Sequence, residues 1–453
     1  DAKTYDVAAL ARSYVSGATI EGPEDLAALA VLPRLCSELY EQLCAQEMDT
    51  LFNEIELPLC EVLADMEYEG FAVDRAGVEE FGRMLDEGIA EVTEEIYRLA
   101  GRHFNINSTR ELGEVLFEEL KLPAGKKTKT GYSTSAEVLE SIAALHEIVP
   151  AVLEYRKLSK LASTYVTGLL KVVGEDGRVH STFNQTETRT GRISSSEPNV
   201  QNIPVRTKLG SEMRRFFVAR EGYVLVDADY SQIELRILAH IAEDQNMLRA
   251  FNEKADIHTE TAAQVFGLSA DMVPPELRSR AKAINFGIVY GIGAFSLSKQ
   301  INVPVYEAKE YIQSYLKTYS GVAAYQHDIV EAARRDGYVK TMFGRRREVL
   351  DIYSKNKNVR AFAERVALNT PVQGTAADII KLAMIRVHRR IREEGLHAKL
   401  VLQVHDELIV EAREDEAERA AAIVSEEMEH AAQLRVKLVA DVHTGKNWYE
   451  AKQ

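Results

Sequence analysis

The stretch YVLVDADYSQIELR at residues 223–236 passes from strand-forming to helix-forming sequence at a carboxylate. Its first half is apolar and rich in β-formers, and residues 231–241 carry isoleucine every four positions, which indicates a helix. A carboxylate at a strand end is rigidly held and exposed at a sheet edge, which suits a metal ligand. Asp227 and Asp229 fall on the same face of the strand, so the residues alone leave both open. The alternative role of such an Asp is an ordinary helix cap.

A second pair of carboxylates lies in AKLVLQVHDELIVEA at 398–412. Two apolar runs flank the polar tip His405-Asp406-Glu407, which predicts a β-hairpin. Adjacent carboxylates at a tight tip repel each other unless solvent or a cation offsets their charge; a plain polar turn is the alternative. Further strands are predicted at 169–173, 179–183 and 223–230, and a helix and a strand after 412. The two strand groups can pair only if the helical block between them is an insertion, which predicts one sheet-based catalytic domain carrying a helical subdomain.

Together the two sites predict carboxylates that one sheet brings close to each other. Hard oxygen ligands of this kind suit Mg²⁺, which keeps waters and takes phosphate oxygens from its substrate. Two such ions roughly 3.5–4 Å apart clamp an in-line phosphoryl displacement.

A third site lies in PPELRSRAKAINFGIVYG at 274–291, where the two prolines mark a helix start. Arg278, Lys282, Phe286 and Tyr290 recur every four residues and span roughly 120° of one helix face. Two cations followed by two aromatics fit a nucleoside triphosphate, because the cations meet phosphates and the aromatics meet the sugar and base. The alternative is a helix whose aromatic stripe packs in the core.

The net charge of −15 argues weakly against a nucleic-acid partner, yet the charges are unevenly distributed. Acidic residues crowd 79–95 and 411–430, and basic residues cluster between them. The clusters are Lys126, Lys127 and Lys129; Arg206 and Lys208; Arg214 and Arg215; Arg278, Arg280 and Lys282; Arg345, Arg346 and Arg347; and Lys355, Lys357 and Arg360. A basic cleft in an acidic body would focus the field on a polyanion, whereas each cluster alone is typical of solvated surface charge.

Other segments carry weaker signals. Residues 52–163 are helical and charged and are split by a polar loop at 123–135, which suits two long helices with a basic tip laid along a nucleic-acid backbone. The stretch 369–378 joins an amide-bearing turn to a helix, and amides can contact base acceptors in the minor groove. Cys36, Cys44 and Cys60 lack the spacing of a metal site or a disulfide framework and are expected to be buried thiols. No run of 18 apolar residues and no signal-peptide pattern occurs, so a cytoplasmic protein without a membrane partner is expected.

DYSQIELR at 229–236, RxxxKxxxNFGxxYG at 278–291 and VHDE at 404–407 stand in the order of the three polymerase motifs of family A DNA polymerases, which this chain resembles. TGRISSSEPNVQNIP at 190–204 and NTPVQGTAADIIK at 369–381 also match. The resemblance implies an α+β right-hand polymerase fold, with an antiparallel-sheet palm and helical fingers and thumb. It places the thumb at 53–165, the palm at 166–240 and 370–453, and the fingers at 241–369.

The resemblance also implies roles for residues. It selects Asp229 over Asp227 and makes Asp406 the second metal carboxylate, with a backbone carbonyl from Tyr230 and an auxiliary Glu407. It implies two Mg²⁺ ions, for which Mn²⁺ can substitute, and it makes Lys282 a candidate proton donor to pyrophosphate. The implied nucleotide-binding residues are Gln232, Glu234, His258, Arg278, Lys282, Phe286 and Tyr290. The implied DNA-binding residues are Arg192, Asn369, Gln373 and His405.

The expected activity is therefore primer extension by a monomer, with primer–template DNA and dNTPs as partners. Residues 1–52 resemble a remnant of a 3′–5′ exonuclease-like domain, in which Asp6 of YDVAALARSYV echoes one carboxylate. The Tyr-x-x-x-Asp signature is absent near 23–27, so no proofreading is expected. Asp1 is not a natural start, and a longer protein with an upstream 5′-nuclease domain is expected. A single-subunit RNA polymerase, a metal nuclease and a catalytically silent DNA-binding protein are the alternatives, and the bulk of Glu234 argues against the first.

Overall fold

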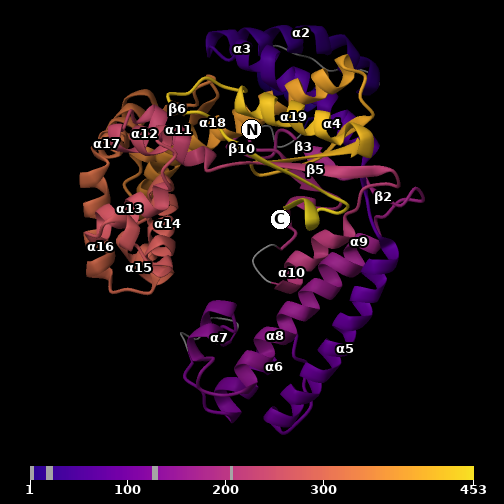
Figure 1. The fold of residues 1–453 in the computed structure, drawn as a ribbon, viewed down its shortest axis with the longest axis vertical. Helices are drawn as coiled ribbons and strands as arrows, with labels where there is room; N and C mark the ends of the chain where they lie inside the picture. Colours follow the sequence, from indigo (N-terminus) through magenta and orange to yellow (C-terminus); the bar gives the residue numbers. More distant parts are fainter. Residues whose placement is uncertain (1–4, 17–23, 125–130, 205–207, 453) are drawn as a thin grey trace.

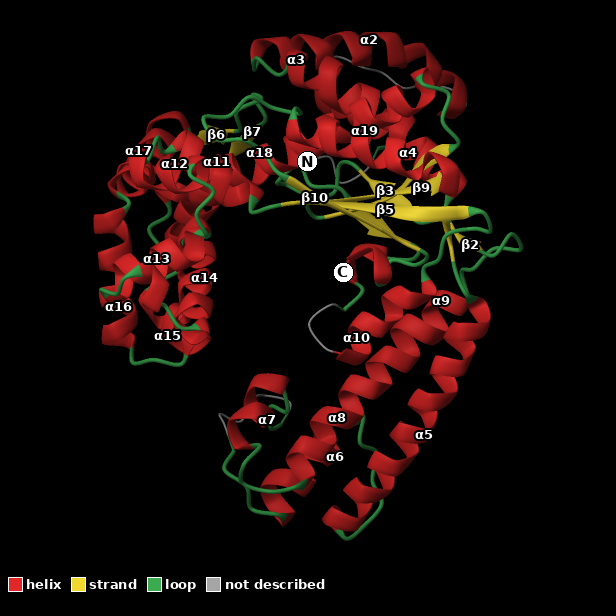
Figure 2. Ribbon diagram, viewed as in Figure 1, coloured by secondary structure: helices red, strands yellow, loops and turns green. Residues whose placement is uncertain are grey.

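The computed structural model describes residues 5–16, 24–124, 131–204 and 208–452. Two helical arms extend on opposite sides of a central region that contains the main sheet (Figure 1). Figure 2 shows that strands are concentrated in this centre and that the arms are built from helices. The expected α+β right-hand class is confirmed by this arrangement and by the similarities reported below.

The central sheet has four antiparallel strands in the order β10-β5-β9-β8. The strands are β5 (Tyr223–Tyr230), β8 (Ala398–Val404), β9 (Glu407–Arg413) and β10 (Ala440–Gly445). The register pairs Asp229 of β5 with Glu407 of β9 and with Asp441 of β10. The predicted pairing of the two distant strand groups is thus confirmed, and the helical block between them is an insertion.

Three helices cover one face of this sheet, namely α4 (Leu57–Glu69), α18 (Lys357–Glu393) and α19 (Ala417–Glu429). Val226, Leu408 and Val410 share one face of the sheet by strand pairing and are fully buried. Burial of each such side chain stabilises the fold by about 1.5–3 kcal/mol, which makes this layer the main core. The helix α4 therefore lies against the sheet, although its residues fall in the range that the resemblance gives to the thumb.

The helix predicted in the second part of 369–378 is confirmed, but the turn predicted to precede it is wrong, because α18 runs unbroken through Pro371. Proline removes one helical hydrogen bond, but the apolar side chains that follow keep a helical spacing and are buried against the sheet and its neighbours. Val372, Ile379 and Ile380 are each at most 3% exposed. Tertiary burial here outweighs the local helix-breaking tendency.

The thumb-side arm consists of α5 (Arg75–Ala100) packed against α8 (Ile148–Lys160). The latter continues through a π-helical turn, η3 (Leu161–Thr167), into α9 (Gly168–Leu170). The strand predicted at 169–173 is therefore wrong: Val166 and Leu169 lie on the buried side of this helical continuation. A second hydrophobic cluster at the far end of the arm involves α6 (Thr109–Gly113), η2 (Glu114–Glu119) and α7 (Ala136–Ile142).

The fingers-side arm is helical, as expected for the inserted block. Its helices are α11 (Ile233–Ile241), α12 (Gln245–Asn252), α13 (Ile257–Phe266), α14 (Pro275–Val289), α15 (Ala294–Ile301), α16 (Val305–Thr318) and α17 (Ser320–Asp336). A small hairpin, β6 (Tyr338–Lys340) and β7 (Arg346–Glu348), links this arm to α18. The helix start predicted by the two prolines is confirmed, because Pro275 is the first residue of α14.

Short elements complete the chain. The strand predicted at 179–183 is split between two pairs, β1 (Phe71–Ala72) with β2 (Arg178–Val179) and β3 (Thr182–Asn184) with β4 (Ser194–Ser196). The remaining helix and turns are α10 (Lys208–Glu212), η4 (Val200–Asn202), η5 (Met213–Phe216), η6 (Ala270–Met272), η7 (Leu350–Tyr353), η8 (Glu414–Glu416) and η9 (Glu450–Lys452). Lys126, Lys127, Lys129, Arg206 and the side chain of Lys208 lie outside the described residues.

The N-terminal unit consists of α1 (Val7–Tyr14), α2 (Glu24–Ala45), α3 (Asp49–Leu51) and η1 (Phe52–Glu56). Asp6 caps α1, since its Oδ1 accepts a hydrogen bond of 2.7 Å from the Ala9 amide. The expectation of buried thiols is wrong: Cys36, Cys44 and Cys60 are all exposed and free. The small core of this unit uses Ala11, Val15 and Leu35, and Cys36 and Cys44 lie on the exposed side of α2.

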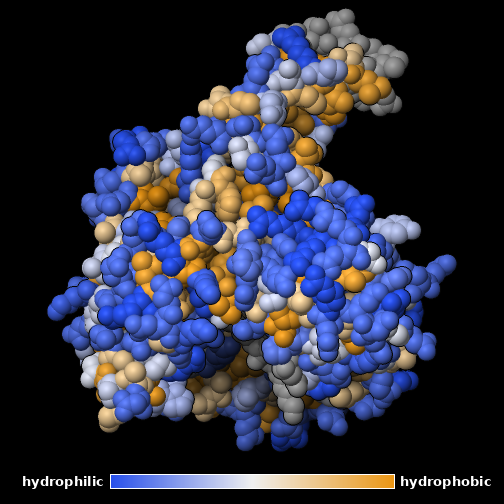
Figure 3. Space-filling model, turned by 45° about the horizontal axis from the view of Figure 1, so that its top comes forward, coloured by the Kyte–Doolittle hydropathy of each residue, from blue (hydrophilic) through white to orange (hydrophobic). Residues whose placement is uncertain are grey.

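The face drawn in Figure 3 is largely hydrophilic, and its apolar side chains occur in scattered patches. Within the described part of the chain, no helix combines the length and the apolar character that a membrane crossing needs.

Candidate active site

The two predicted carboxylates meet at one end of the central sheet. Asp229 is the penultimate residue of β5, and Asp406 lies in the two-residue turn between β8 and β9. His405 shares this turn with a φ of 56°, the left-handed conformation that tight hairpin turns need. The Tyr230 amide donates a hydrogen bond of 3.1 Å to the backbone carbonyl of Asp406, which fixes the turn beside β5. Burial and the nearby Asp229 charge raise the pKa of Asp406 to about 7.

The structure distinguishes Asp227 from Asp229. Asp227 is 1% exposed, whereas the Asp229 side chain is 37% exposed. Burial and the neighbouring Glu407 carboxylate raise the pKa of Asp227 to about 9, so Asp227 holds a proton at neutral pH. Burial alone would raise the pKa of Glu407, but a hydrogen bond from Asp227 and the Lys452 charge lower it. Asp229 is therefore the accessible carboxylate. Asp227 is buried and shares its proton with Glu407.

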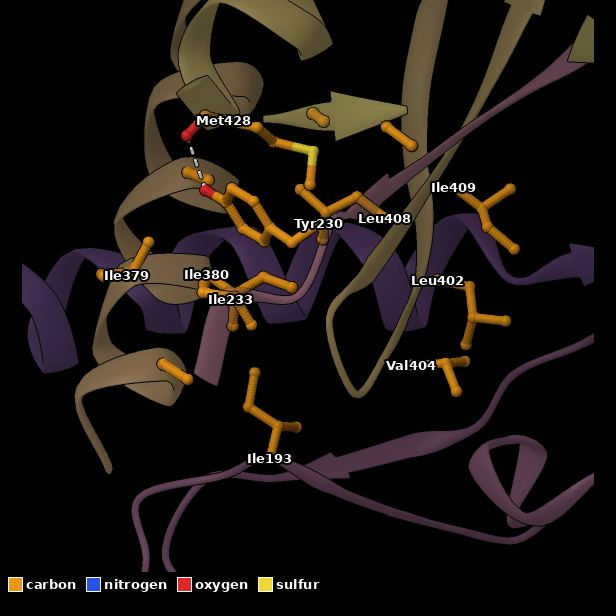
Figure 4. Packing of buried hydrophobic residues seen from close by; sticks show 14 of the residues in the cluster. Ile193, Tyr230, Ile233, Ile379, Ile380, Leu402, Val404, Leu408, Ile409 and Met428 are labelled. Atoms are coloured by element: carbon orange, nitrogen blue, oxygen red, sulfur yellow. Dashed lines mark hydrogen bonds between the residues drawn. The ribbon is translucent and has the colours of Figure 1, made fainter. Parts of the chain in front are cut away.

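Tyr230 reaches this site through its backbone alone. Its ring packs among Ile233, Ile380 and Met428, and its hydroxyl donates a hydrogen bond of 2.7 Å to the Met428 carbonyl (Figure 4). Burial raises the pKa of this hydroxyl, which keeps it neutral. The ring anchors the end of β5 and so steadies Asp229 next to it.

The chemistry of these donors fits a hard cation. Asp229 Oδ1 is buried and has no hydrogen-bond partner in the described chain. A buried oxygen without a partner costs about 1–3 kcal/mol, which a bound cation would offset. In the described ranges no three or more His, Cys, Asp or Glu side chains are gathered closely enough to hold a metal ion by themselves. A site with few protein carboxylates is typical of Mg²⁺, which takes its other ligands from water and substrate phosphates.

A cavity of about 400 Å³ opens beside the carboxylates and collects residues from all three predicted motifs. Eleven predicted residues line it: Arg192, Tyr230, Gln232, Glu234, His258, Arg278, Lys282, Phe286, Tyr290, His405 and Asp406. Asp229 and Glu407 lie next to Asp406 but not in the lining, and Asn369 and Gln373 also lie outside it. The cavity has the size of a small-molecule site.

One face of α14 supplies four of the lining residues. Arg278, Lys282, Phe286 and Tyr290 all face the cavity, as their four-residue spacing predicts. The core side of the helix is formed by smaller residues instead, including Ala281, Ile284 and Ile288. The alternative of an aromatic core stripe is therefore wrong. No described residue forms an ion pair with Lys282, so its charge is available to an anion.

His258 faces the same end of the cavity as a neutral ring. Burial, together with the nearby Arg278 and Lys282 charges, lowers its pKa to about 4. Asn285 Nδ2 donates to His258 Nδ1 at 3.0 Å, which leaves the proton on Nε2. Asp256 caps α13 and accepts a 2.5 Å hydrogen bond from Arg278 Nε. This end of the cavity therefore presents two cations and one neutral donor.

The other end of α14 is tied to the helix that follows β5. Glu234 lies in the first turn of α11 and is 7% exposed. Its carboxylate accepts a hydrogen bond of 2.5 Å from Tyr290 and one of 2.7 Å from Arg192. Gln232, which precedes α11, is held in the left-handed region with φ 56°. Three distant segments thus form one wall of the cavity.

Residues 75–450 match the model of DNA polymerase family A. The chain belongs to this family. It is 53% identical over 415 residues to DNA polymerase I of Bacillus caldotenax, covering 91% of this chain and 47% of that protein. It is 49% identical over 438 residues to the thermostable DNA polymerase I of Thermus thermophilus, covering 96% and 52% respectively.

A solved structure of the polymerase domain of Pol1 from M. smegmatis, in complex with DNA primer-template and dNTP, superimposes with a TM-score of 0.94 at 41% identity. The match covers 100% of this chain and 80% of that one. The chain spans about half the length of the curated relatives it matches. These findings confirm the family resemblance and the α+β right-hand fold.

In this family A chain, Asn369 and Gln373 lie within α18, four residues apart. The same helix lines the cavity further along with Ala376, Ala377 and Ile380. Helical spacing therefore puts the two amides on a stripe that continues out of the cavity. The Asn369 Oδ1 atom is buried and has no partner within the described residues.

Sequence reasoning missed a buried ionic network behind the cavity. Lys381 lines the cavity and is fully buried, and its Nζ lies 2.7 Å from Glu56 Oε1. Arg345 bridges Glu56 and Asp378. The sequence did carry one signal for this network. Asp378 and Lys381 are charged residues three positions apart within an otherwise apolar helical segment, which indicates a buried ion pair.

Sequence reasoning also missed the residues that surround Glu407. Trp448 Nε1 donates to Glu407 Oε1 at 2.5 Å, and the Arg214 guanidinium stacks 3.9 Å from the centre of the Trp448 ring. Lys452 Nζ lies 2.9 Å from both Glu407 Oε2 and Asp229 Oδ2. No periodicity or strand pattern marks these positions, although Trp448 is the single tryptophan of the chain.

Proposed function

We propose that this protein is a DNA-templated DNA polymerase that extends a primer 3′-hydroxyl with dNTPs and releases pyrophosphate. One observation carries the proposal: a single cavity is lined both by Asp406, beside Asp229 at the end of the sheet, and by the cationic and aromatic face of α14. That combination matches the two ends of a nucleoside triphosphate undergoing phosphoryl transfer. The names of the relatives, and the DNA and dNTP in the complex of the structural neighbour, support it.

The division into functional parts follows from the same architecture. The palm would comprise 166–240 and 370–453, the fingers 241–369 and the thumb 53–165, with 1–52 an exonuclease-like remnant. The four-stranded sheet and the two helical arms support this division. The packing of α4 on the sheet extends the palm core toward the thumb side.

Within the cavity, Arg278, Lys282 and His258 would bind the triphosphate. The two cations attract the phosphates, and the neutral His258 offers its Nε2 proton as a hydrogen-bond donor. Phe286 and Tyr290 would contact the sugar and base. Lys282 lacks an ion-pair partner among the described residues and would donate a proton to the leaving pyrophosphate.

At the carboxylate end, Asp229, Asp406 and the carbonyl of Tyr230 would hold two Mg²⁺ ions, or Mn²⁺ in their place, with Glu407 as an auxiliary. Bound there, the ions would lower the pKa of the attacking hydroxyl and neutralise charge on the phosphates. The buried, unpartnered oxygen of Asp229 supports this assignment. The backbone hydrogen bond from Tyr230 to Asp406 keeps the two carboxylates at a set spacing.

The primer and template would lie along the remaining predicted residues. Arg192 and His405 line the cavity next to the carboxylates, where a primer end would have to meet the nucleotide. Asn369 and Gln373 continue this surface along α18 as amide donors and acceptors. We propose that the protein acts as a cytoplasmic monomer.

One assay tests the function against its alternatives. The protein is incubated with Mg²⁺ and an end-labelled primer–template, together with dNTPs, rNTPs or no nucleotide. A polymerase of the proposed kind lengthens the primer with dNTPs alone. Extension with rNTPs would identify an RNA polymerase, and shortening without nucleotide would identify a nuclease. A primer of unchanged length would indicate a DNA-binding protein without catalytic activity.

A further inference from the structure

The C-terminal turn carries a cation into the carboxylate cluster. Lys452 Nζ lies 2.9 Å from Asp229 Oδ2, 2.9 Å from Glu407 Oε2 and 3.7 Å from Asp227 Oδ1. One ammonium thus contacts three carboxyl groups from two neighbouring strands. In Figure 1 the C-terminus lies beside the main sheet, between the two arms.

The position of Lys452 is built into the fold. The Trp448 amide donates to the Phe217 carbonyl at 2.9 Å, and the Trp448 ring is fully buried. The short helix η9 begins two residues later and ends at Lys452. Because Trp448 also hydrogen-bonds Glu407, the same turn fixes both the lysine and one of its carboxylate partners.

An ordinary surface ion pair would look different. An exposed ion pair of a lysine contributes little to the stability of the fold, because water screens the charges and both side chains are flexible. Here the lysine side chain is 33% exposed, while Glu407 and Asp227 are 6% and 2% exposed. A carboxylate as deeply buried as Glu407 is strongly disfavoured unless a cation and hydrogen bonds offset its charge, and Lys452 supplies that cation.

We propose that Lys452 is a resident counter-cation of the active-site carboxylates, and that a divalent ion must compete with it for Asp229. Lys452 is thus a positioning residue that holds Asp229 and Glu407 together while no metal is bound. This inference rests on the proposed metal role of Asp229. Two cations next to one carboxylate repel each other, so the ammonium weakens metal binding until the nucleotide phosphates add further negative charge.

The test measures Mn²⁺ binding to the full chain without DNA or nucleotide, by the electron paramagnetic resonance signal of free Mn²⁺. Lys452→Met keeps the aliphatic stem and removes the charge. We expect it to bind Mn²⁺ on the order of tenfold more tightly than the parent, because the competing charge is gone. Lys452→Gln is the second uncharged variant and should behave alike, while Lys452→Arg should keep the weak affinity of the parent.

Lys446→Met is the matched control. Lys446 is also near the C-terminus, but it is 60% exposed and pairs with Glu414, so its replacement should leave Mn²⁺ affinity unchanged. Adding Asp229→Asn to Lys452→Met should abolish the gain. A second readout is the melting temperature, which should be lower for Lys452→Met than for the parent in EDTA and should rise more on adding Mn²⁺.

Equal or weaker Mn²⁺ binding by both uncharged variants would overturn the proposal. A gain that persists with Asp229→Asn would also overturn it, because the ion would then bind elsewhere. The result stands apart from the proposed function: failure of the parent to extend a primer would reject the polymerase activity, whereas the Mn²⁺ comparison decides the role of Lys452 alone.

Discussion

Glu234 and Tyr290 are joined by a hydrogen bond of 2.5 Å in one wall of the cavity, although 56 residues separate them in the chain. Glu234 is also held at 2.7 Å by Arg192, so its carboxylate cannot swing out of the cavity wall without breaking both contacts. From the sequence, the bulk of Glu234 argues against a ribonucleotide-using polymerase. The structure supplies the contact itself.

The first prediction follows from that wall. Glu234→Ala removes both the bulk and the anchor of Tyr290, so space opens where a 2′-hydroxyl would lie. The ratio of kcat/KM for rNTP to that for dNTP should rise by about tenfold or more, equivalent to about 1.4 kcal/mol. Glu276→Ala, an exposed position in the first turn of α14, is the control. An unchanged ratio for Glu234→Ala would remove Glu234 from this role.

The second prediction concerns the carboxylates. Asp229→Asn or Asp406→Asn should abolish primer extension and leave primer–template binding largely intact, because each change removes one metal ligand. Extension is measured with Mg²⁺ and binding by fluorescence anisotropy. Near-normal extension by either variant would show that the assignment is wrong.

Asp227→Asn is the matched control for that experiment. Burial and Glu407 raise the pKa of Asp227 to about 9, so an amide closely resembles the protonated acid already present at neutral pH. Its effect on extension should be mild. A loss as large as that of Asp229→Asn would place Asp227 among the metal ligands.

The third prediction concerns Phe286, which faces the cavity one helical turn beyond Lys282 and lies 5.8 Å from the His258 ring. A dideoxynucleotide lacks the 3′-hydroxyl that can hydrogen-bond its own phosphate, and a phenyl ring offers no replacement. That loss costs about 1–3 kcal/mol, or roughly five- to 150-fold discrimination. Phe286→Tyr should largely remove the preference for dNTP over ddNTP in kcat/KM.

Phe295→Tyr adds the same hydroxyl at a ring that is 63% exposed and absent from the cavity lining. This control should keep the parental preference. If the parent accepts both nucleotides equally, or if Phe286→Tyr keeps the preference, Phe286 does not lie at the sugar.

The fourth prediction is that the protein lacks proofreading. The reason is that Asp6 caps a helix and is not gathered with other carboxylates in the described residues. A 3′-mismatched, end-labelled primer incubated with Mg²⁺ and without dNTP should keep its length. Steady shortening that persists in Asp406→Asn would reveal an exonuclease independent of the polymerase site.

The fifth prediction concerns stability and pH. Burial lowers the pKa of His258 to about 4, below its ordinary value of 6.5. As pH falls, His258 is therefore protonated in the unfolded chain before it is protonated in the folded one. The free energy of unfolding that the neutral His258 contributes above about pH 6.5 is lost toward pH 4. The shift corresponds to no more than about 3 kcal/mol.

His258→Gln removes the titrating group. The difference in melting temperature between the parent and this variant should therefore shrink between pH 7.5 and pH 5. His103→Gln, an exposed position in the thumb-side arm, should show a constant difference. A constant difference for His258→Gln would mean that His258 is not held neutral in the folded state.

The sequence predicted the elements whose patterns are local. The strand at 223–230 and the helix start at Pro275 agree with the structure because alternation and proline placement act over a few residues. The four-residue stripe on α14 was predicted for the same reason. The turn predicted before the helix in 369–378 was wrong because packing of α18 outweighed the local effect of Pro371.

By itself, the sequence determined the order of strand, turn and helix around Asp229 and Asp406, and the residue types that α14 presents. These depend on backbone preferences and spacing, which neighbouring residues encode. Only the tertiary structure decided that Asp227 is buried while Asp229 is accessible, that Glu234 contacts Tyr290, and that Lys452 lies between carboxylates. Burial and ion pairing depend on which distant segments pack together, and no local pattern carries that information.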